Sequence, residues 1–436
     1  MSLEHFFNYE KEETAEDCYP IYTTVKPPLE LDPSWTEILA MSDEQFKLFT
    51  EDLRLYYLDM WNNHKTPVTG NNNTVEQIID KMKKFNNLDI MDEKIYFEQN
   101  NKIFLSGWNN WGNTVNHWFP EMINIDMGRG KSVVPSIQAA VFDPDLWFTR
   151  THRILRKDCL NIFHKKPDNP ICSGFRSAIR IVSGAQPALQ IRLPVAKWIY
   201  ETSMQEIDED RIICWDPSMG WAGRLLAFLS ASTHPDNIGK KCIYIGTDPN
   251  SAIFDRYKMV EKFWKTYIDK DCTAEIIPLC IGSEEFHNTK EFKKYKGKGH
   301  IAYTSPPYFN RERYSEDEEQ SFRKFPQYTL WRDGFLKGTM ENVSKFLAEK
   351  SIFFWNIADI RISAKLTYPL QNDSIKFAEE RGFKLDETIY MLMRALAGRD
   401  TSEETFKKIV ERGTMNVVEV NNKFQKYEPV YMFRRG

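Results

Sequence analysis

The chain lacks several features that would assign it to other classes of protein. None of its apolar runs approaches the roughly 20 residues of a membrane-spanning helix. Residues 1–5 do not begin the basic and then apolar pattern of a signal peptide. The seven cysteines are scattered and include no Cys-x-x-Cys pair. These absences predict reduced thiols in a cytoplasmic protein with no membrane partner.

A zinc site is not expected either. The nearest grouping of possible ligands is His152, Cys159, His164 and Cys172. Their spacing matches none of the tight knuckles that hold a structural zinc ion. The sequence therefore predicts no bound metal.

A strong excess of positive charge is also absent. The chain has 58 basic and 62 acidic residues, a net charge of −4. The negative charge comes from the N-terminal segment, because residues 1–60 hold 14 acidic and 4 basic residues, whereas the remainder has a net charge of +6. A phosphate-bearing partner is therefore not excluded, although strong non-specific DNA binding is not expected.

What is present is a change of pattern along the chain. Residues 1–30 are acidic and weakly periodic, whereas residues 34–63 and 74–85 have the apolar spacing of helices. From residue 187 onwards, short β-rich runs alternate with helical segments, which predicts a parallel sheet with helices on both faces. We expect a mainly helical N-terminal domain over 1–180 and an α/β domain over 181–436. The strands are expected at 211–215, 242–246, 275–280, 300–303, 351–356, 388–392, 417–420 and 430–434.

Polar residues or glycines follow each of the first four strands. In an open parallel sheet the carboxyl ends of the strands form one rim, where ligands bind. This rim is expected to place a binding site. The residues at these positions are Asp216, Gly220, Gly223, Asp248, Ser283 and Ser305.

The stretch after the fourth strand is unusual in its chemistry. Ser305, Pro306 and Pro307 form a rigid turn in which the prolines donate no N–H, so the nearby carbonyls have no ladder partner. Tyr308 and Phe309 add flat aromatic faces. Hydrogen-bond acceptors beside a stacking surface suit an exocyclic amine on a planar base. Taken alone, the stretch is equally consistent with an ordinary Pro-Pro strand exit.

The glycine loop after the first strand argues against a dinucleotide cofactor. A nicotinamide enzyme needs Gly-x-Gly-x-x-Gly because its backbone must approach a pyrophosphate. Gly220-Trp-Ala-Gly223 lacks that spacing. A cofactor without phosphate, with Asp248 near its ribose hydroxyls, fits better.

Together these motifs resemble the class I S-adenosylmethionine-dependent methyltransferases that act on exocyclic amines of DNA bases. Ser305-Pro306-Pro307-Tyr308 is similar to their (Asp/Asn/Ser)-Pro-Pro-Tyr motif, and residues 194–200 and 427–435 resemble the flanking segment and the closing strand. The resemblance covers residues 187–436 and implies a Rossmann-like methyltransferase sheet that binds S-adenosylmethionine. The cofactor contacts that it implies are Asp216, Ser218, Gly220, Gly223, Asp248, Pro249 and Ser283.

The chain departs from the common pattern at two places. Trp221 and Ala222 stand in the glycine loop where small residues are usual, and Gly223-Arg224 is similar to a variant loop of phage and virus members. The acidic residue expected after the third strand is ambiguous among residues 283–285. Both departures concern individual cofactor contacts.

The resemblance implies direct methyl transfer, with Ser305, Pro306, Pro307 and Tyr308 as the catalytic motif. The Ser305 hydroxyl and the Pro306 carbonyl would accept hydrogen bonds from the amine, while Tyr308 stacks on a base flipped out of the duplex. Serine in the first motif position favours cytosine N4 in DNA. Adenine N6, a base in RNA, and an inactive subunit that only binds a partner are the alternatives.

Contacts to nucleic acid are expected from two further regions. The charged segment 310–324 is predicted to be a flexible lid, and its Arg311, Arg313 and Tyr314, together with Phe309, are expected to contact the substrate. The alternative is a solvated loop. In the N-terminal domain, a tryptophan and asparagine patch at 101–119 and a basic stretch that includes Arg176 and Arg180 could read bases and phosphates. A core corner and a solvated face are their ordinary alternatives.

Overall fold

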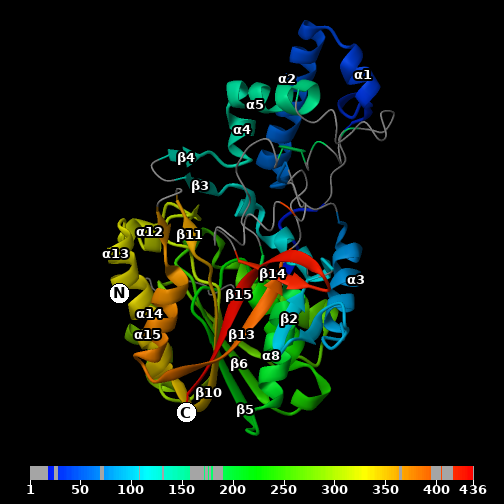
Figure 1. The fold of residues 1–436 in the computed structure, drawn as a ribbon. Helices are drawn as coiled ribbons and strands as arrows, with labels where there is room; N and C mark the ends of the chain where they lie inside the picture. The colour runs from blue at the N-terminus through cyan, green and yellow to red at the C-terminus, as the bar shows by residue number, and fades with distance from the viewer. Residues whose placement is uncertain are drawn as a thin grey trace, which may run out of the picture.

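The computed structural model describes most of the chain. Its helices and strands form a mixed α/β fold around one large sheet (Figure 1). The described residues are 18–23, 28–68, 73–107, 109–129, 132–157, 171, 175, 178–179, 190–362, 366–393, 404 and 416–435.

Five parallel strands form the centre of the sheet. They lie in the order β7-β6-β5-β8-β10, the doubly wound order in which the direction of the connections changes between β5 and β8. All five strands were predicted from the sequence and are confirmed. Their bounds are β5 Arg211–Asp216, β6 Lys241–Thr247, β7 Glu275–Leu279, β8 Gly299–Thr304 and β10 Leu347–Asn356.

A reversed strand lies next to β10. β15 (Lys423–Arg435) runs antiparallel between β10 and β13 (Phe383–Leu392). Beside it, β14 (Val417–Val420) forms a hairpin with the start of β15. The mostly parallel sheet with one inserted antiparallel strand confirms the predicted Rossmann-like methyltransferase fold.

The sheet also contains two strands that the sequence did not reveal. β1 (Tyr96–Gln99) and β2 (Lys102–Ser106) form a hairpin, and β2 pairs in parallel with β13. Both precede residue 180, so the expected division at that residue does not separate the sheet from the N-terminal part.

Helices cover both faces of the sheet (Figure 1). One face packs against α8, α9 and α10, and α3 lies over α9 in the same apolar core. The other face packs against α11, α14 and α15. These helices are α3 Val75–Asn86, α8 Leu193–Gln205, α9 Gly223–Ser232, α10 Arg256–Phe263, α11 Lys290–Tyr295, α14 Lys337–Phe346 and α15 Leu370–Glu379. The predicted helix over 328–348 is made of α13 (Tyr328–Trp331), a wider π turn and α14.

The remaining N-terminal helices have a core of their own at one end of the molecule (Figure 1). α1 and α2 each begin with a capping box, Ser34 with Glu37 and Ser42 with Gln45, which satisfies the free N–H groups of the first turn. In the part of the chain that the structure describes, no helix is long and apolar enough to cross a membrane. The bounds are α1 Trp35–Ala40, α2 Asp43–His64, α4 Ala139–Phe142 and α5 Pro144–His152.

The segment after Tyr308 is held differently from the expectation. Glu312–Arg313 forms β9, which pairs with β3 (Asp126–Arg129), and β3 in turn pairs with β4 (Ser132–Val134). The prediction of a free lid over 310–324 is therefore wrong at β9, because backbone hydrogen bonds tie that strand to the N-terminal part. The short helix α12 (Ser321–Lys324) follows β9 in the chain. A separate two-stranded sheet is formed by β11 (Ile360–Arg361) and β12 (Thr367–Tyr368).

Candidate active site

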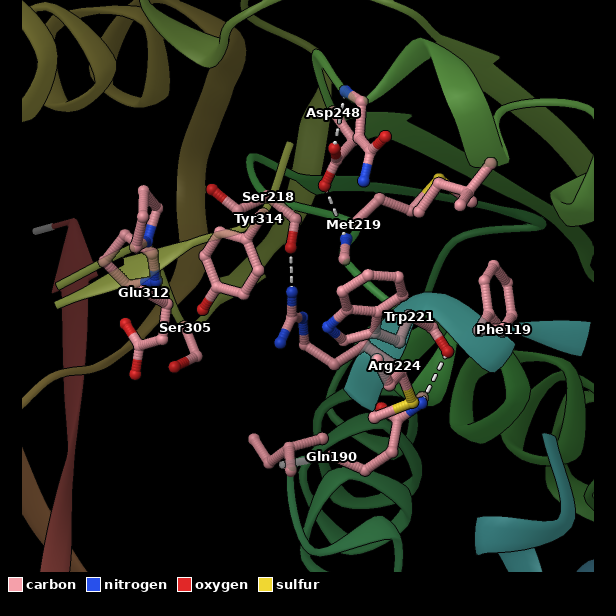
Figure 2. A pocket seen from close by; sticks show the side chains of 18 of the residues that line it. Phe119, Gln190, Ser218, Met219, Trp221, Arg224, Asp248, Ser305, Glu312 and Tyr314 are labelled. Carbon is pink, nitrogen blue, oxygen red and sulfur yellow. Dashed lines mark hydrogen bonds between the residues drawn. The ribbon is translucent and has the colours of Figure 1, made fainter. Parts of the chain in front are cut away.

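A cavity of about 610 Å³ lies at the carboxyl ends of the central strands. Its volume is within the range of small-molecule sites. Residues from the loops that follow β5, β6, β7 and β8 converge on it, together with the β9 segment and residues from before 181 (Figure 2). The predicted site residues that line it are Ser218, Gly220, Gly223, Asp248, Pro249, Ser283, Ser305, Pro306, Pro307 and Tyr308.

Asp216 differs from these residues because it lies beneath the cavity. Its side chain is fully buried and accepts hydrogen bonds from Arg224 Nε at 2.7 Å, Tyr244 Oη at 2.6 Å and Thr304 Oγ1 at 3.0 Å. Asp216 also accepts from the backbone N–H of Ser218. The predicted direct cofactor contact is therefore corrected: Asp216 fixes the loop, and its oxygens are fully occupied by protein groups.

The glycine loop is shaped by its backbone. Gly220 has a φ of +56°, in the left-handed region that glycine tolerates best, and its N–H donates to Asp248 Oδ2 at 2.8 Å. Ala222 is also left-handed, with a φ of +61°. A Cβ at Gly223 would collide with the side chain of Gln190, which donates to the Trp221 carbonyl at 2.6 Å (Figure 2). The left-handed φ favours glycine at position 220, and the contact with Gln190 favours it at position 223.

Asp248 directly follows β6 and presents a carboxylate to the cavity. It is held by the N–H groups of Gly220 at 2.8 Å and Asn250 at 3.0 Å (Figure 2). Burial raises the pKa of Asp248 to about 6, although these two N–H groups oppose the shift. A carboxylate fixed in this way is suited to accept hydrogen bonds from a pair of vicinal hydroxyls.

The third strand leads into Ser283 and Glu284, which both line the cavity. The Ser283 hydroxyl is engaged with Thr339 Oγ1 at 2.7 Å, whereas Glu284 forms an ion pair with Lys324 at 3.0 Å. Burial raises the pKa of Glu284. Of the residues left open by the sequence, Glu285 does not belong to the described lining.

The Ser-Pro-Pro-Tyr turn forms the opposite wall. Ser305 and Tyr308 are half-buried, and the Tyr308 hydroxyl donates to Glu428 of β15. Burial raises the pKa of Glu428. Glu312 and Tyr314, from the segment that follows, also line this wall (Figure 2). Glu312 and Glu428 were missed by the sequence analysis, since neither belongs to a motif.

The residues predicted to contact nucleic acid are placed elsewhere. Phe309 is only 2% exposed and packs against Tyr328, Trp331 and Tyr368, so its predicted contact with a base is corrected to a place in the apolar core. Arg311 and Arg313 are half-buried and do not belong to the described cavity lining. Arg176 and Arg180 lie outside the described residues.

The tryptophan and asparagine patch divides into two parts. Trp118 is fully buried and donates to the Cys18 carbonyl at 3.0 Å, which matches the alternative of a core corner. Three amides of the patch face the cavity instead: Asn110, Asn113 and Asn116. Across the described ranges, no group of three or more His, Cys, Asp or Glu side chains could hold a metal ion.

Comparisons with known proteins add little beyond the topology. No protein-family model and no curated protein matches the chain. Among solved structures, precorrin-6y C5,15-methyltransferase from Geobacter metallireducens aligns with a TM-score of 0.28 and 9% identity, over 55% of this chain and 87% of that one. An S-adenosylmethionine-dependent O-methyltransferase from Thermotoga maritima gives 0.33 and 9%, over 59% and 71%.

A candidate DNA modification methylase from Thermus thermophilus aligns with a TM-score of 0.22 and 15% identity, over 35% of this chain and 50% of that one. Similarity at these scores carries no argument about a substrate. The strand order of the sheet itself gives the chain the fold of S-adenosylmethionine-dependent methyltransferases.

Proposed function

We propose that the protein transfers a methyl group from S-adenosylmethionine to an exocyclic amine of a base in DNA, with cytosine N4 as the first candidate and adenine N6 as the second. One observation carries the proposal. Asp248 with the Gly220 loop, and Ser305 with Tyr308, come from different strands and line the same cavity. The site thus joins a place for a ribose-bearing cofactor to a place for a planar amine.

The residues present fit such a cofactor. The carboxylate of Asp248 faces the cavity and is held in position by two N–H groups, and Gly220 and Gly223 line the cavity beside it without side chains of their own. Asp248 would bind the ribose hydroxyls, and Ser218 and Gly220 would border the methionine end. S-adenosylmethionine supplies an electrophilic methyl group to such a site.

The protein side of the reaction is positioning. The Ser305 hydroxyl and the Pro306 carbonyl accept hydrogen bonds from the target amine, which localises its lone pair on nitrogen and aims it at the methyl donor. Tyr308 provides the stacking face for the base, and Glu428 fixes that ring through its hydroxyl. The target base must leave its stack to reach this depth.

The direct test is transfer of a labelled methyl group. The protein is incubated with radiolabelled S-adenosylmethionine and either DNA or RNA, and the labelled nucleosides are separated by chromatography. Label on N4-methylcytosine in DNA is expected, and Ser305→Ala should weaken the signal. Label on N6-methyladenine would favour the second candidate, label confined to RNA would exclude DNA as substrate, and no label on either polymer would contradict the proposal.

Cofactor affinity is expected to depend on pH through Asp248. The pKa of this carboxyl is raised to about 6, so it is ionised above pH 6 and accepts both ribose hydroxyls there. Below pH 6 it becomes protonated, and the dissociation constant should rise about tenfold per pH unit. Calorimetric titration with S-adenosylmethionine between pH 5 and 8 measures this change.

Asp248→Asn serves as the control for this titration. Its affinity should be lower at pH 8 by about 10- to 100-fold, because charged hydrogen bonds are worth about 1.5–3 kcal/mol, and it should vary little with pH. A wild-type dissociation constant that stays level from pH 5 to 8 would rule out this role of Asp248.

A further inference from the structure

Glu312 occupies a position that methyl transfer by positioning alone leaves unexplained. It lies on β9, where its backbone pairs with Met127 of β3, so the strand is fixed from the N-terminal side. Its side chain lines the cavity together with Ser305 and Tyr314. Figure 2 shows the Glu312 carboxylate and the Ser305 hydroxyl pointing toward the same space.

The position of the Glu312 carboxylate is energetically unfavourable. Its Oε2 atom is buried and has no hydrogen-bond partner among the described residues, although an unsatisfied buried carboxylate is unfavourable. Burial raises the pKa of Glu312 to about 7. Arg311, the Tyr308 N–H and the Tyr314 hydroxyl oppose this shift, while the charge of Glu428 on β15 adds to it. The residue of β3 that pairs with Glu312 is Met127, which is apolar and has no charge to add.

The other described acids at the cavity already have partners. Glu428 accepts from the Tyr308 hydroxyl, and Asp248 accepts from two N–H groups. The two buried oxygens of Glu284 have no hydrogen-bond partner among the described residues, but the carboxylate is ion-paired with Lys324 and follows the third strand, away from the Ser-Pro-Pro-Tyr turn. Glu319 is exposed and also reaches Lys324. Glu312 therefore offers an uncommitted carboxylate oxygen on the wall that holds the Ser-Pro-Pro-Tyr turn.

We propose that Glu312 accepts the proton that the target amine loses when it is methylated. This role rests on the proposed function and adds a catalytic residue to it. The nitrogen lone pair forms the N–C bond, the S–C bond breaks with its electron pair on sulfur, and the nitrogen becomes positively charged. One N–H bond then breaks, its electrons stay on nitrogen, and the proton moves to Oε2 of Glu312. Solvent receives the proton when the product leaves.

The raised pKa suits this task. A base works best when its pKa is near the operating pH, because it is then partly ionised and still binds a proton well. An ordinary exposed glutamate, with a pKa near 4.3, would hold the proton weakly.

The test compares Glu312→Gln with Glu318→Gln, an exposed glutamate of the same segment that does not belong to the described lining. Single-turnover methyl transfer is measured from pH 5.5 to 9. For the wild type and for Glu318→Gln, the rate should rise about tenfold per pH unit below pH 7 and level off above it. Glu312→Gln should be slower by about 100-fold and lose this pH dependence, whereas Glu312→Asp should keep the dependence at a lower rate.

Two further readouts separate a proton acceptor from a structural role. Calorimetry should give the same cofactor affinity for Glu312→Gln and the wild type. Because the pKa of Glu312 is raised to about 7 in the folded protein, the folded state loses stability as the pH rises from the ordinary pKa of a glutamate to about 7, and this loss remains at higher pH. Glu312→Gln should therefore melt at or above the wild-type temperature at pH 8, so slow transfer cannot be ascribed to unfolding.

The outcomes distinguish this inference from the proposed function. A Glu312→Gln variant with the wild-type rate or the wild-type pH profile would overturn the proton-accepting role and leave the methyltransferase assignment standing. A wild-type protein that transfers no methyl group to any base would overturn the proposed function and, with it, the role of Glu312.

Discussion

Replacing Asp216 with alanine is expected to destabilise the protein by about 3–5 kcal/mol, the cost of removing one partner of a buried ion pair. Asp216 is fully buried, and Arg224 is 7% exposed and donates to it at 2.7 Å. Burial opposes the charge of Arg224, while the Asp216 carboxylate favours it and raises the pKa of this guanidinium above its ordinary value. An arginine is not deprotonated in proteins, so the variant leaves a buried positive charge without its partner. The midpoint of urea denaturation, followed by circular dichroism, measures the loss.

The matched controls are Asp236→Ala and the double variant Asp216→Ala with Arg224→Met. Asp236 is an exposed aspartate outside the site, so its loss should change the midpoint little. The double variant removes both charges, and it should recover part of the stability lost in Asp216→Ala. If Asp216→Ala denatured at the wild-type midpoint, the buried pair would not be what holds the loop.

Tyr308→Ala is expected to lower kcat/KM for the nucleic acid by about 100-fold. Stacking of a base on an aromatic ring is worth about 1–3 kcal/mol, which corresponds to a factor of about 5 to 150. The variant also leaves Glu428 without the hydroxyl that donates to it, which adds to the loss. Steady-state transfer of labelled methyl groups measures the effect, while calorimetry should show little change in cofactor affinity.

Tyr308→Phe separates the two contributions. It keeps the aromatic face and removes the hydroxyl, so we expect activity between those of the wild type and Tyr308→Ala. A phenylalanine variant as slow as the alanine variant would place the effect in the link to Glu428. An alanine variant with full activity would show that Tyr308 does not stack on the base.

The central sheet could be predicted because each strand and the loop after it can be recognised from a few consecutive residues. The apolar runs at β5, β6 and β8 are followed directly by Asp216, by Asp248 and by Ser305. In a parallel sheet such ends must meet on one rim, so a local pattern is sufficient to bring distant residues together. Most of the predicted site residues line the observed cavity for this reason.

What could not be predicted depends on long-range pairing or on burial. Glu428 reaches the site because β15 is inserted beside β10, and Glu312 because β9 pairs with β3. No local periodicity indicates either partner. Phe309 follows the motif directly, but it packs against Tyr328 and Tyr368. Sequence position alone did not distinguish a ring that faces the cavity from one that faces the core.

The position of β15 sets the order in which the sheet can assemble. β5, β6, β7, β8 and β10 can pair as soon as residue 356 has left the ribosome, whereas β13 is joined to them only through β15, at Lys423–Arg435. The hairpin of β1 and β2 is made early but can join the sheet only after β13, because β2 pairs with β13. Such non-local pairings fold slowly and leave strand edges exposed meanwhile. The sheet therefore has an open edge at β10 from the time that strand is made until β15 pairs with it.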